Sequence, residues 1–182
     1  MEINLPDRLE GILTLDLETK DSFLTSRGPG WAWEKRGHIA GIALQCDNFE
    51  GYLPIGHQDG ASNMDPEKVL SWLKYQLAQP SKHPVIAFNS TYDIGWLRRF
   101  GVTTNRVVED VILQAPLLNE HRFSFSLDTL SRDILDDKKD ELALKNAAAA
   151  IGLKPTTKEA KANIWRLPAE IVGGYAVQDV RL

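Results

Sequence analysis

The stretch GILTLDLE, residues 11–18, is an apolar run whose far end carries two acids, Asp16 and Glu18. Its length and its leucine content are typical of a strand that is buried on both faces of a sheet. Side chains two apart on a strand point to the same face, about 7 Å from each other, so both carboxylates would lie together. Sheets of this class tend to open their sites at the carboxyl ends of central strands. The stretch therefore predicts a central strand that ends either in an acidic site or in a polar turn.

Strand and helix patterns alternate along the rest of the chain. Strands are predicted at residues 11–18, 38–46, 50–55, 84–88 and 107–110. Helices are predicted at residues 66–78, about 91–101, 111–119, 126–135, 138–151 and 168–182. Asp65 is expected to cap the first of these helices, and Ser90 or Thr91 the second. Three early strands at hairpin spacing, followed by a β-α-β unit, predict an α/β fold with one mixed sheet flanked by helices.

Composition limits the range of functions. The chain has 182 residues, of which 43% are hydrophobic, and this is enough for one domain with a real core. Its single cysteine, Cys46, excludes an intrachain disulfide, and the four histidines show no zinc-site spacing. The sequence shows no signal-peptide pattern and no apolar run near the ~20 residues that cross a membrane, which predicts a reducing, cytoplasmic setting. The net charge of -4 argues against a broad basic surface for nucleic acid, but a small acidic site that works with metal cations is compatible with it.

Two further stretches place polar groups on helices. In AFNSTYDIGWL, residues 87–97, Asp93 falls in the first turn of a helix that follows a buried strand. An acid in this place also has a simple structural explanation, the helix dipole, which contributes only ~0.5 kcal/mol. In YAVQD, residues 175–179, Tyr175 and Asp179 are neighbours on one helix face. The alternative for this pair is a partly buried tyrosine beside a surface acid.

Taken in order, these residues form three short patterns at domain-sized intervals: Asp16-x-Glu18, Asn89-x-x-Tyr92-Asp93 and Tyr175-x-x-x-Asp179. The patterns resemble the three exonuclease motifs of the DEDD superfamily. More closely, the chain resembles the 3′–5′ proofreading domain of family A DNA polymerases. Residues 51–57, 109–119 and 124–130 resemble stretches of that domain and occur in the same order. The loop at residues 26–38 is similar to loops of the phage-type members. The resemblance implies a ribonuclease-H-like fold, in which a mixed five-stranded sheet has helices on both sides.

The resemblance also indicates a branch of the superfamily. One branch has a histidine five residues before the last aspartate, where this chain has Gly174. Tyr175 lies four residues before Asp179, so the chain resembles the tyrosine branch. No motif position is substituted, which favours a working exonuclease.

The resemblance further implies two divalent ions, Mg²⁺ or Mn²⁺, held by four acids. Carboxylates supply the oxygen ligands that these cations need, and two ions about 3.5–4 Å apart can stabilise both the attacking and the leaving oxygen. In the family scheme Asp16 bridges both ions. Glu18 and Asp179 complete the first ion site, and Asp93 holds the second. Tyr175 orients the attacking water.

The resemblance implies substrate contacts at Thr19, Phe23 and Asn89. Thr19 and Phe23 follow the first motif and would hold the 3′-terminal nucleotide, with Phe23 as an apolar wedge against the base. Ordinary core packing is the alternative for Phe23. Asn89 would contact the sugar-phosphate backbone, and local capping is its alternative.

Two charged stretches allow weaker interpretations. Trp31, Trp33, Lys35 and Arg36 form a basic-aromatic loop that could stack on single-stranded DNA and neutralise it, or the tryptophans could anchor the loop to the protein. The run DDKKDE, residues 136–141, is interpreted as a solvated helix start without a function.

We therefore expect a metal-dependent 3′–5′ exonuclease that releases 5′-mononucleotides from single-stranded or frayed DNA ends and proofreads for a DNA polymerase. Residues 1–182 are expected to form an exonuclease domain that precedes a polymerase domain in a longer chain, because the last predicted helix has no glycine or asparagine cap. The host cytoplasm would be the location of a phage-encoded protein. Two alternatives stay open: an RNA 3′-end-trimming exonuclease of the ribonuclease D type, and a non-catalytic domain that guides DNA for an attached polymerase.

Overall fold

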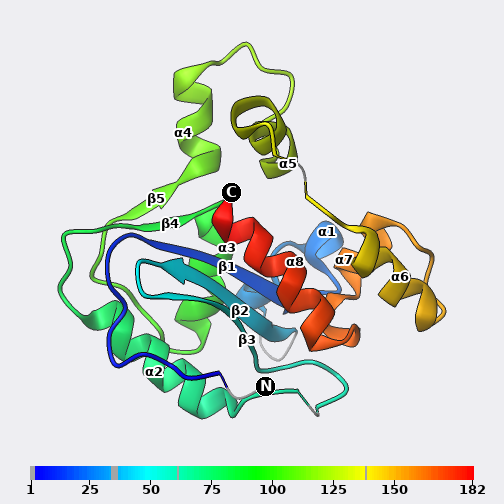
Figure 1. Cartoon of the computed structure of the whole chain (residues 1–182), viewed down its shortest axis with the longest axis horizontal. Coiled ribbons are helices and arrows are strands. Elements are labelled where there is room, and N and C mark those ends of the chain that lie inside the picture. The colour runs from blue at the N-terminus through cyan, green and yellow to red at the C-terminus, as the bar shows by residue number, and fades with distance from the viewer. Residues whose placement is uncertain (1–2, 34–36, 61, 138) are drawn as a thin grey trace.

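The centre of the computed structural model is a mixed five-stranded sheet in the order β3-β2-β1-β4-β5, and the structure describes residues 3–33, 37–60, 62–137 and 139–182 (Figure 1). The strands are β1 (Leu13–Lys20), β2 (His38–Cys46), β3 (Phe49–Pro54), β4 (Val85–Ala87) and β5 (Val108–Asp110). The first three strands pair antiparallel, whereas β1, β4 and β5 run parallel. The predicted mixed sheet is confirmed, and β1 continues two residues beyond its predicted end at Glu18.

Helices lie on both faces of this sheet and beyond one end of it (Figure 1). The α-helices of the described chain are α1 (Leu24–Arg27), α2 (Pro66–Ala78), α3 (Ser90–Arg99), α4 (Val111–Leu118), α5 (Leu127–Leu130), α6 (Leu142–Ala150), α7 (Thr157–Ala162) and α8 (Ala169–Arg181). Single 3₁₀ turns occur at Gly30–Ala32 and Ile164–Arg166, and a π-helical turn at Ser131–Leu135 continues α5. Among the described residues, no helix combines the length and the apolar character that crossing a membrane requires.

The helix ends show which local signals were reliable. Asp65 caps α2 as predicted, since its side chain accepts from the backbone N–H groups of Glu67 and Lys68. The expectation that Ser90 or Thr91 caps α3 is wrong, because Asn89 occupies the N-cap position and Ser90 is already helical. The helix predicted at 138–151 begins only at Leu142, and the short helices α1 and α7 were not predicted.

Alternation along β1 sends its apolar and acidic side chains to opposite faces of the sheet. Leu15 and Leu17 are buried in a core shared with α2 and α3. Asp16 is paired across the sheet with Ala43, which is buried against α8 on the other face. The two acids of β1 therefore face α8, while the leucines that alternate with them fix the strand to the main core.

A close contact between α8 and the sheet sets the position of α8. A Cβ atom added to Gly173 would lie 3.1 Å from the Tyr52 ring, so glycine permits the approach of the helix to β3. The Tyr52 hydroxyl donates to His57 Nε2 at 2.8 Å, because His57 Nδ1 donates to the Leu167 carbonyl at 2.9 Å. Burial lowers the pKa of His57, which favours this neutral form. The contact and the hydrogen bonds tie β3 to the residues that lead into α8.

Asp110 fixes the turn between β4 and α3. This carboxylate is 7% exposed, and it accepts from the Asn89 N–H at 2.9 Å and from the Ser90 N–H at 2.7 Å. It also accepts from the Ser90 hydroxyl at 2.9 Å and from the Ile112 N–H at 3.1 Å. Asn89 has a φ of 65°, a left-handed conformation that asparagine tolerates better than most residues. The acid at the end of β5 thus orders the turn before Asp93.

We expect Asp110→Ala to lower the free energy of unfolding by about 2–4 kcal/mol, because it leaves several partly buried donors without an acceptor. Urea unfolding monitored by circular dichroism measures the change. Glu109→Ala is the matched control, since the Glu109 carboxylate accepts one exposed hydrogen bond, from Gln114. The control should lose no more than about 0.5 kcal/mol. Equal stability of the two variants would contradict the role given to Asp110.

Candidate metal and catalytic site

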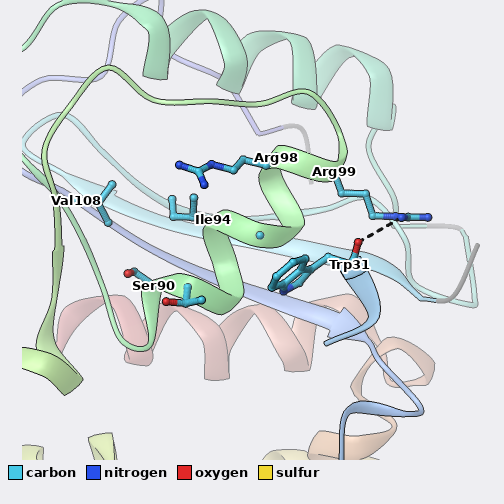
Figure 2. A pocket seen from close by; sticks show the side chains of 8 residues that line it. Trp31, Ser90, Ile94, Arg98, Arg99 and Val108 are labelled. Atoms are coloured by element: carbon cyan, nitrogen blue, oxygen red, sulfur yellow. Dashed lines mark hydrogen bonds between the residues drawn. The ribbon is translucent and has the colours of Figure 1, made fainter. Parts of the chain in front are cut away.

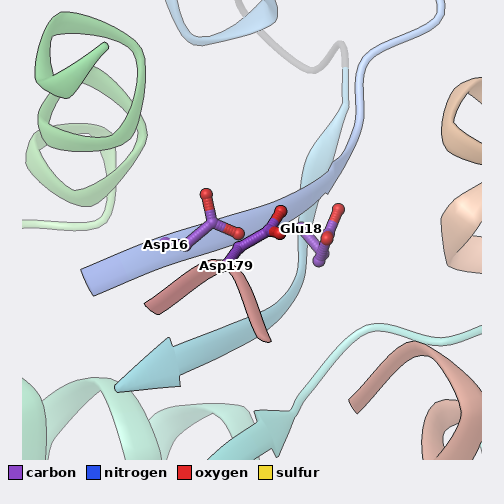
Figure 3. Close-up of side chains that lie close together, drawn as sticks. All are labelled: Asp16, Glu18 and Asp179. Atoms are coloured by element: carbon purple, nitrogen blue, oxygen red, sulfur yellow. The ribbon is translucent and has the colours of Figure 1, made fainter. Parts of the chain in front are cut away.

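Three carboxylates from two elements converge on the face of the sheet that α8 covers. Asp16 and Glu18 come from β1 and Asp179 from α8, and one oxygen from each lies within 4.8 Å of the other two (Figure 3). The strand supplies two acids on one face because they are two residues apart. The helix crosses above them and adds the third, so residues far apart in the sequence build one cluster.

Asp93 lies beside this cluster and outside the group of three. It is in the first turn of α3, as predicted, and its side chain is buried at 3% exposure. Burial raises the pKa of Asp93 well above its ordinary value, and the charges of Asp16 and Glu18 raise it further. The electrostatic influence shows that Asp93 belongs to the same neighbourhood, although its carboxylate is not part of the 4.8 Å group.

Burial and mutual repulsion favour the protonated form of these acids. Burial raises the pKa of Asp16 to about 7, and the charge of Asp179 contributes to the shift. The pKa of Glu18 is raised well above its ordinary value, first by burial and then by the charges of Asp16 and Asp179. The pKa of Asp179 is also raised by burial, against an opposing effect of Lys139. Such a cluster becomes fully ionised near neutral pH only when cations compensate its charge.

Lys139 is a cation of the site that the sequence did not reveal. Its Nζ lies 2.6 Å from Asp179 Oδ1 and 3.2 Å from Asp128 Oδ1, and its side chain is 6% exposed. The interpretation of residues 136–141 as a solvated helix start is therefore wrong at Lys139. The ion pair fixes one oxygen of Asp179, and it joins the segment before α6 to the acidic cluster.

Tyr175 is buried next to Asp179 on α8. It is 6% exposed, and the Asp179 carboxylate is one of the groups that raise the pKa of its phenol. The cations Lys139 and Lys161 lie 5.5 Å and 5.3 Å from the centre of its ring. Burial and the neighbouring acids raise the pKa of Tyr175, so the phenol keeps its proton at neutral pH. A Cβ atom added to Gly174, the position of the histidine in the other branch, would meet no atom within 4 Å.

Thr19 belongs to a hydrogen-bonded chain at the end of β1. Because the Tyr92 hydroxyl donates to Asp21 Oδ2 at 2.9 Å, it accepts from Thr19 Oγ1 at 2.7 Å. The same Asp21 oxygen accepts from the Gly30 N–H at 2.8 Å. Sequence reasoning missed Asp21, whose contacts join β1, α3 and the loop at Gly30. These bonds order the backbone just after the first motif.

Phe23 and Asn89 are accessible at the surface. The Phe23 side chain is 43% exposed, which excludes the alternative of core packing, and it shares a small cavity with Lys20 and Arg27. The side chain of Asn89 makes no cap hydrogen bond at the start of α3, which excludes capping as its role. Core packing therefore does not explain Phe23, and helix capping does not explain the side chain of Asn89.

The loop with two tryptophans is anchored at Trp31. This ring lies against α3, where a Cβ atom added to Gly95 would be 2.4 Å from Trp31 Cε2, and Arg99 donates to the Trp31 carbonyl at 3.4 Å (Figure 2). Trp33 is 46% exposed, and its Nε1 donates to the Arg27 carbonyl at 3.0 Å. Lys35 and Arg36 lie outside the described residues. The anchoring interpretation is correct for Trp31, whereas Trp33 offers an exposed ring.

The acidic cluster suits a divalent cation. Mg²⁺ and similar ions take oxygen ligands, and Asp16, Glu18 and Asp179 offer oxygens within one ion's reach. The pKa of each of these acids is raised, and the positive charge of a bound cation would lower it. Residues far apart in the chain have therefore been brought together in a donor set of the right chemistry.

Comparisons with known proteins find sequence similarity to DNA polymerases of phages and a fold similar to that of nucleases. No family model matches the chain. A DNA-directed DNA polymerase of Pseudomonas phage M6 is 34% identical over 173 residues, which is 93% of this chain and 25% of the relative. A structure described as the apo form of a nuclease superposes with a TM-score of 0.61 at 20% identity and covers 94% of this chain and 67% of its own. Brucella melitensis NrnC with bound Mg²⁺ superposes with a TM-score of 0.53 at 14% identity, over 96% of this chain and 66% of its own.

This chain spans about a quarter of the length of the curated relatives that it matches. The structural likenesses confirm the ribonuclease-H-like fold, with its mixed five-stranded sheet and flanking helices. The motifs, this fold and the related phage polymerases together confirm that the chain resembles the DEDD-type 3′–5′ exonuclease domains of DNA polymerases.

Proposed function

We propose that this chain is a metal-dependent 3′–5′ exonuclease that removes 5′-mononucleotides from single-stranded or frayed DNA ends and proofreads for a DNA polymerase. The observation that carries the proposal is the convergence of Asp16, Glu18 and Asp179, with Asp93 and Tyr175 beside them. Partly buried acids this close together cost free energy unless they hold cations. Metal-dependent chemistry therefore best explains why these acids lie together.

In this proposal two divalent ions, Mg²⁺ or Mn²⁺, are held by the four acids. Asp16, Glu18 and Asp179 hold one ion, and Asp93 together with Asp16 holds the other. When bound, the ions supply positive charge that activates water and stabilises the attacking and leaving oxygens of a phosphodiester. Lys139 keeps one oxygen of Asp179 engaged, which leaves the other oxygen to face the site.

Tyr175 orients the water that attacks the phosphorus. Its O–H is one turn of α8 from Asp179, and its oxygen can accept a hydrogen bond from water. The phenol does not act as a base, because burial keeps its pKa above the ordinary value. Water forms a bond to phosphorus, the bond from phosphorus to the 3′ oxygen of the preceding nucleotide breaks, and that oxygen takes up a proton. The product is a 5′-mononucleotide.

Surface residues near the cluster receive the 3′ end. Phe23 is exposed beside Lys20 and Arg27, so it can pack against the terminal base while the two cations neutralise phosphate. Thr19 lies near the end of β1, and Asn89 lies at the exposed start of α3. We assign Thr19 to the terminal nucleotide and Asn89 to the sugar-phosphate backbone.

We further propose that residues 1–182 are the exonuclease domain of a longer DNA polymerase that acts in the host cytoplasm of a phage. The relatives are named as phage DNA polymerases, and they are about four times as long as the matched region. The helix α4 exposes the apolar side chains of Leu113, Leu117 and Leu118, a surface that an attached polymerase domain would cover.

A digestion assay tests the proposed activity. A single-stranded DNA oligonucleotide labelled at its 5′ end should shorten stepwise in Mg²⁺ and remain intact in EDTA. The same oligonucleotide labelled at its 3′ end should release the label as a mononucleotide in the first step. Faster digestion of an RNA oligonucleotide of the same sequence than of the DNA would support the ribonuclease D alternative. A protein that digests neither oligonucleotide would support the DNA-guiding alternative.

Single alanine changes at Asp16, Glu18, Asp93 or Asp179 should each lower turnover at least about 10²–10³-fold, because the acids form one cluster. Double changes should lose little more than single ones. The melting temperature should not fall for the changes at Asp16, Glu18 and Asp93, because each removes a repelling charge. Asp179→Ala also removes a partner of the buried Lys139 and should lower the melting temperature. Glu170→Ala, which removes an exposed acid from the start of α8, is the control and should keep wild-type turnover. Normal turnover of Asp16→Ala would overturn the site assignment.

The raised pKa values make divalent-ion binding depend on pH. Near pH 6 the folded chain keeps protons on Asp16 and Glu18 that the unfolded chain, with ordinary carboxyl pKa values of about 4, has released. Without divalent ions, the free energy of unfolding should therefore fall as the pH rises from about 5 through 7. An ion must displace the protons, so its apparent affinity should fall about tenfold per pH unit below 7 for each proton displaced.

Thermal unfolding in Mg²⁺ and in EDTA, from about pH 5.5 to about pH 8.5, measures both effects. The rise in Tm caused by Mg²⁺ should be smallest at the acidic end and largest at the alkaline end. The variant Asp16→Asn/Glu18→Gln should show no such rise. A Tm increase that is equal at every pH would show that these carboxyls do not bind the ion.

Tyr175→Phe removes one hydroxyl and keeps the packing of the ring. Turnover should fall about 10²-fold if the hydroxyl positions water, while metal binding and Tm change little. A purely structural tyrosine would give the reverse pattern, with normal turnover and about 1 kcal/mol of stability lost. Rate and stability measured on the same variant separate the two roles. A normal cleavage rate would remove Tyr175 from the mechanism.

A further inference from the structure

A polar cavity lies at the opposite end of the parallel strands from the acidic cluster. Its volume is about 390 Å³, and it is lined by residues before β1, before β4 and before β5. The walls include the segments 8–11 and 80–83 together with Arg106. The acids proposed for catalysis lie on β1 and after β4, toward the carboxyl ends of these strands. The cavity is therefore separate from the proposed active site.

Cations dominate the lining of this cavity. Arg8, Lys82, His83 and Arg106 contribute basic side chains, and Glu10 is the one acid of the lining. Among the residues that the structure describes, no carboxylate lies within 4.0 Å of the side-chain nitrogens of these four residues. A group of uncompensated cations is unexpected in a chain whose net charge is -4.

Arg106 is the strongest sign that the cavity is built for a ligand. Its residue exposure is 7%, its Nε is buried, and that nitrogen has no hydrogen-bond partner in the described structure. Nη1 and Nη2 reach only the carbonyls of Gly11 and Leu9, at 3.4 Å and 3.5 Å. Burial lowers the pKa of Arg106, an interaction with Cys46 opposes this shift, and the charge of Arg8 adds to it. A buried guanidinium with unused donors is costly unless an anion completes it.

We propose that this cavity binds a phosphate group. Arg106 offers a planar set of N–H donors, and the exposed Arg8 and Lys82 add two further cations to the lining. Several cations around one point favour an anion with more than one charge and many acceptor oxygens, which phosphate supplies better than a carboxylate. The His83 N–H donates to Ser81 Oγ at 3.1 Å, and this bond shapes the loop that carries Lys82. The phosphate can be free, part of a mononucleotide, or part of a nucleic-acid backbone.

Isothermal titration calorimetry with orthophosphate, in EDTA and at constant ionic strength, tests the proposal on the whole chain. The variant Arg8→Gln/Lys82→Gln removes two exposed cations and leaves the buried Arg106 and the fold in place. It should weaken phosphate binding at least about tenfold, because charged hydrogen bonds to an anion are lost. The control Lys68→Gln/Lys74→Gln removes the same charge from the exposed side of α2 and should bind like the wild type.

Two further titrations distinguish the sources of the phosphate. Binding of orthophosphate or thymidine 5′-monophosphate that requires Arg8 and Lys82 supports a free phosphate or a monoester. Binding of only an oligothymidylate without terminal phosphates, with the same requirement, supports a backbone phosphodiester. The proposal is overturned if none of the three binds, or if the cavity variant and the control variant bind equally well. EDTA prevents metal-dependent cleavage, so these outcomes are independent of the proposed exonuclease activity.

Discussion

Repulsion among partly buried carboxylates is the constraint on which the rest of this structure depends. Asp16, Glu18 and Asp179 place oxygens within 4.8 Å of one another, and burial strengthens their repulsion. A flexible segment would move such charges apart. Both elements that carry them are therefore held from several sides: β1 pairs with two strands, and α8 packs over the sheet at Gly173. The fold positions the acids, and cations must neutralise them.

Lys139 shows how the chain itself provides part of that neutralisation. Its ammonium group lowers the pKa of Asp16 and Asp179, and Lys161 acts in the same direction. Both ammonium groups lie within 5.5 Å of the centre of the Tyr175 ring, so they bring positive charge near the cluster. The site thus retains a demand for further positive charge, which is the property that a metal-binding site needs.

Local periodicity predicted much of this arrangement from the sequence. Asp16 and Glu18 share a face because side chains repeat every two residues on a strand, and Tyr175 contacts Asp179 because they are four apart on a helix. The five strands and the mixed sheet followed from apolar runs and their spacing. The convergence of the acids could be expected only from the resemblance to a known family, because periodicity does not say which elements meet.

The features that the sequence did not predict depend on contacts between distant residues. Lys139 reads as one charge in a polar run until the fold brings it 2.6 Å from Asp179. Asp110 reads as the last residue of a strand, yet it accepts the hydrogen bonds that allow Asn89 a left-handed conformation. Ser90 has the side chain of a helix cap, but its hydroxyl bonds instead to Asp110. In each case a tertiary partner outweighs the local preference.

The distribution of charge explains why net charge is a poor guide to the partners of this chain. Acids gather on β1 and α8, while cations gather before the amino ends of the parallel strands and around Phe23. A negatively charged strand of nucleic acid cannot approach the acidic cluster through electrostatic attraction unless metal ions reverse the local field. In the proposed exonuclease, Lys20 and Arg27 would attract the strand, so approach and catalysis would be served by different groups. A chain of net charge -4 can therefore act on a polyanion, because charges within about a Debye length of the ligand dominate its attraction.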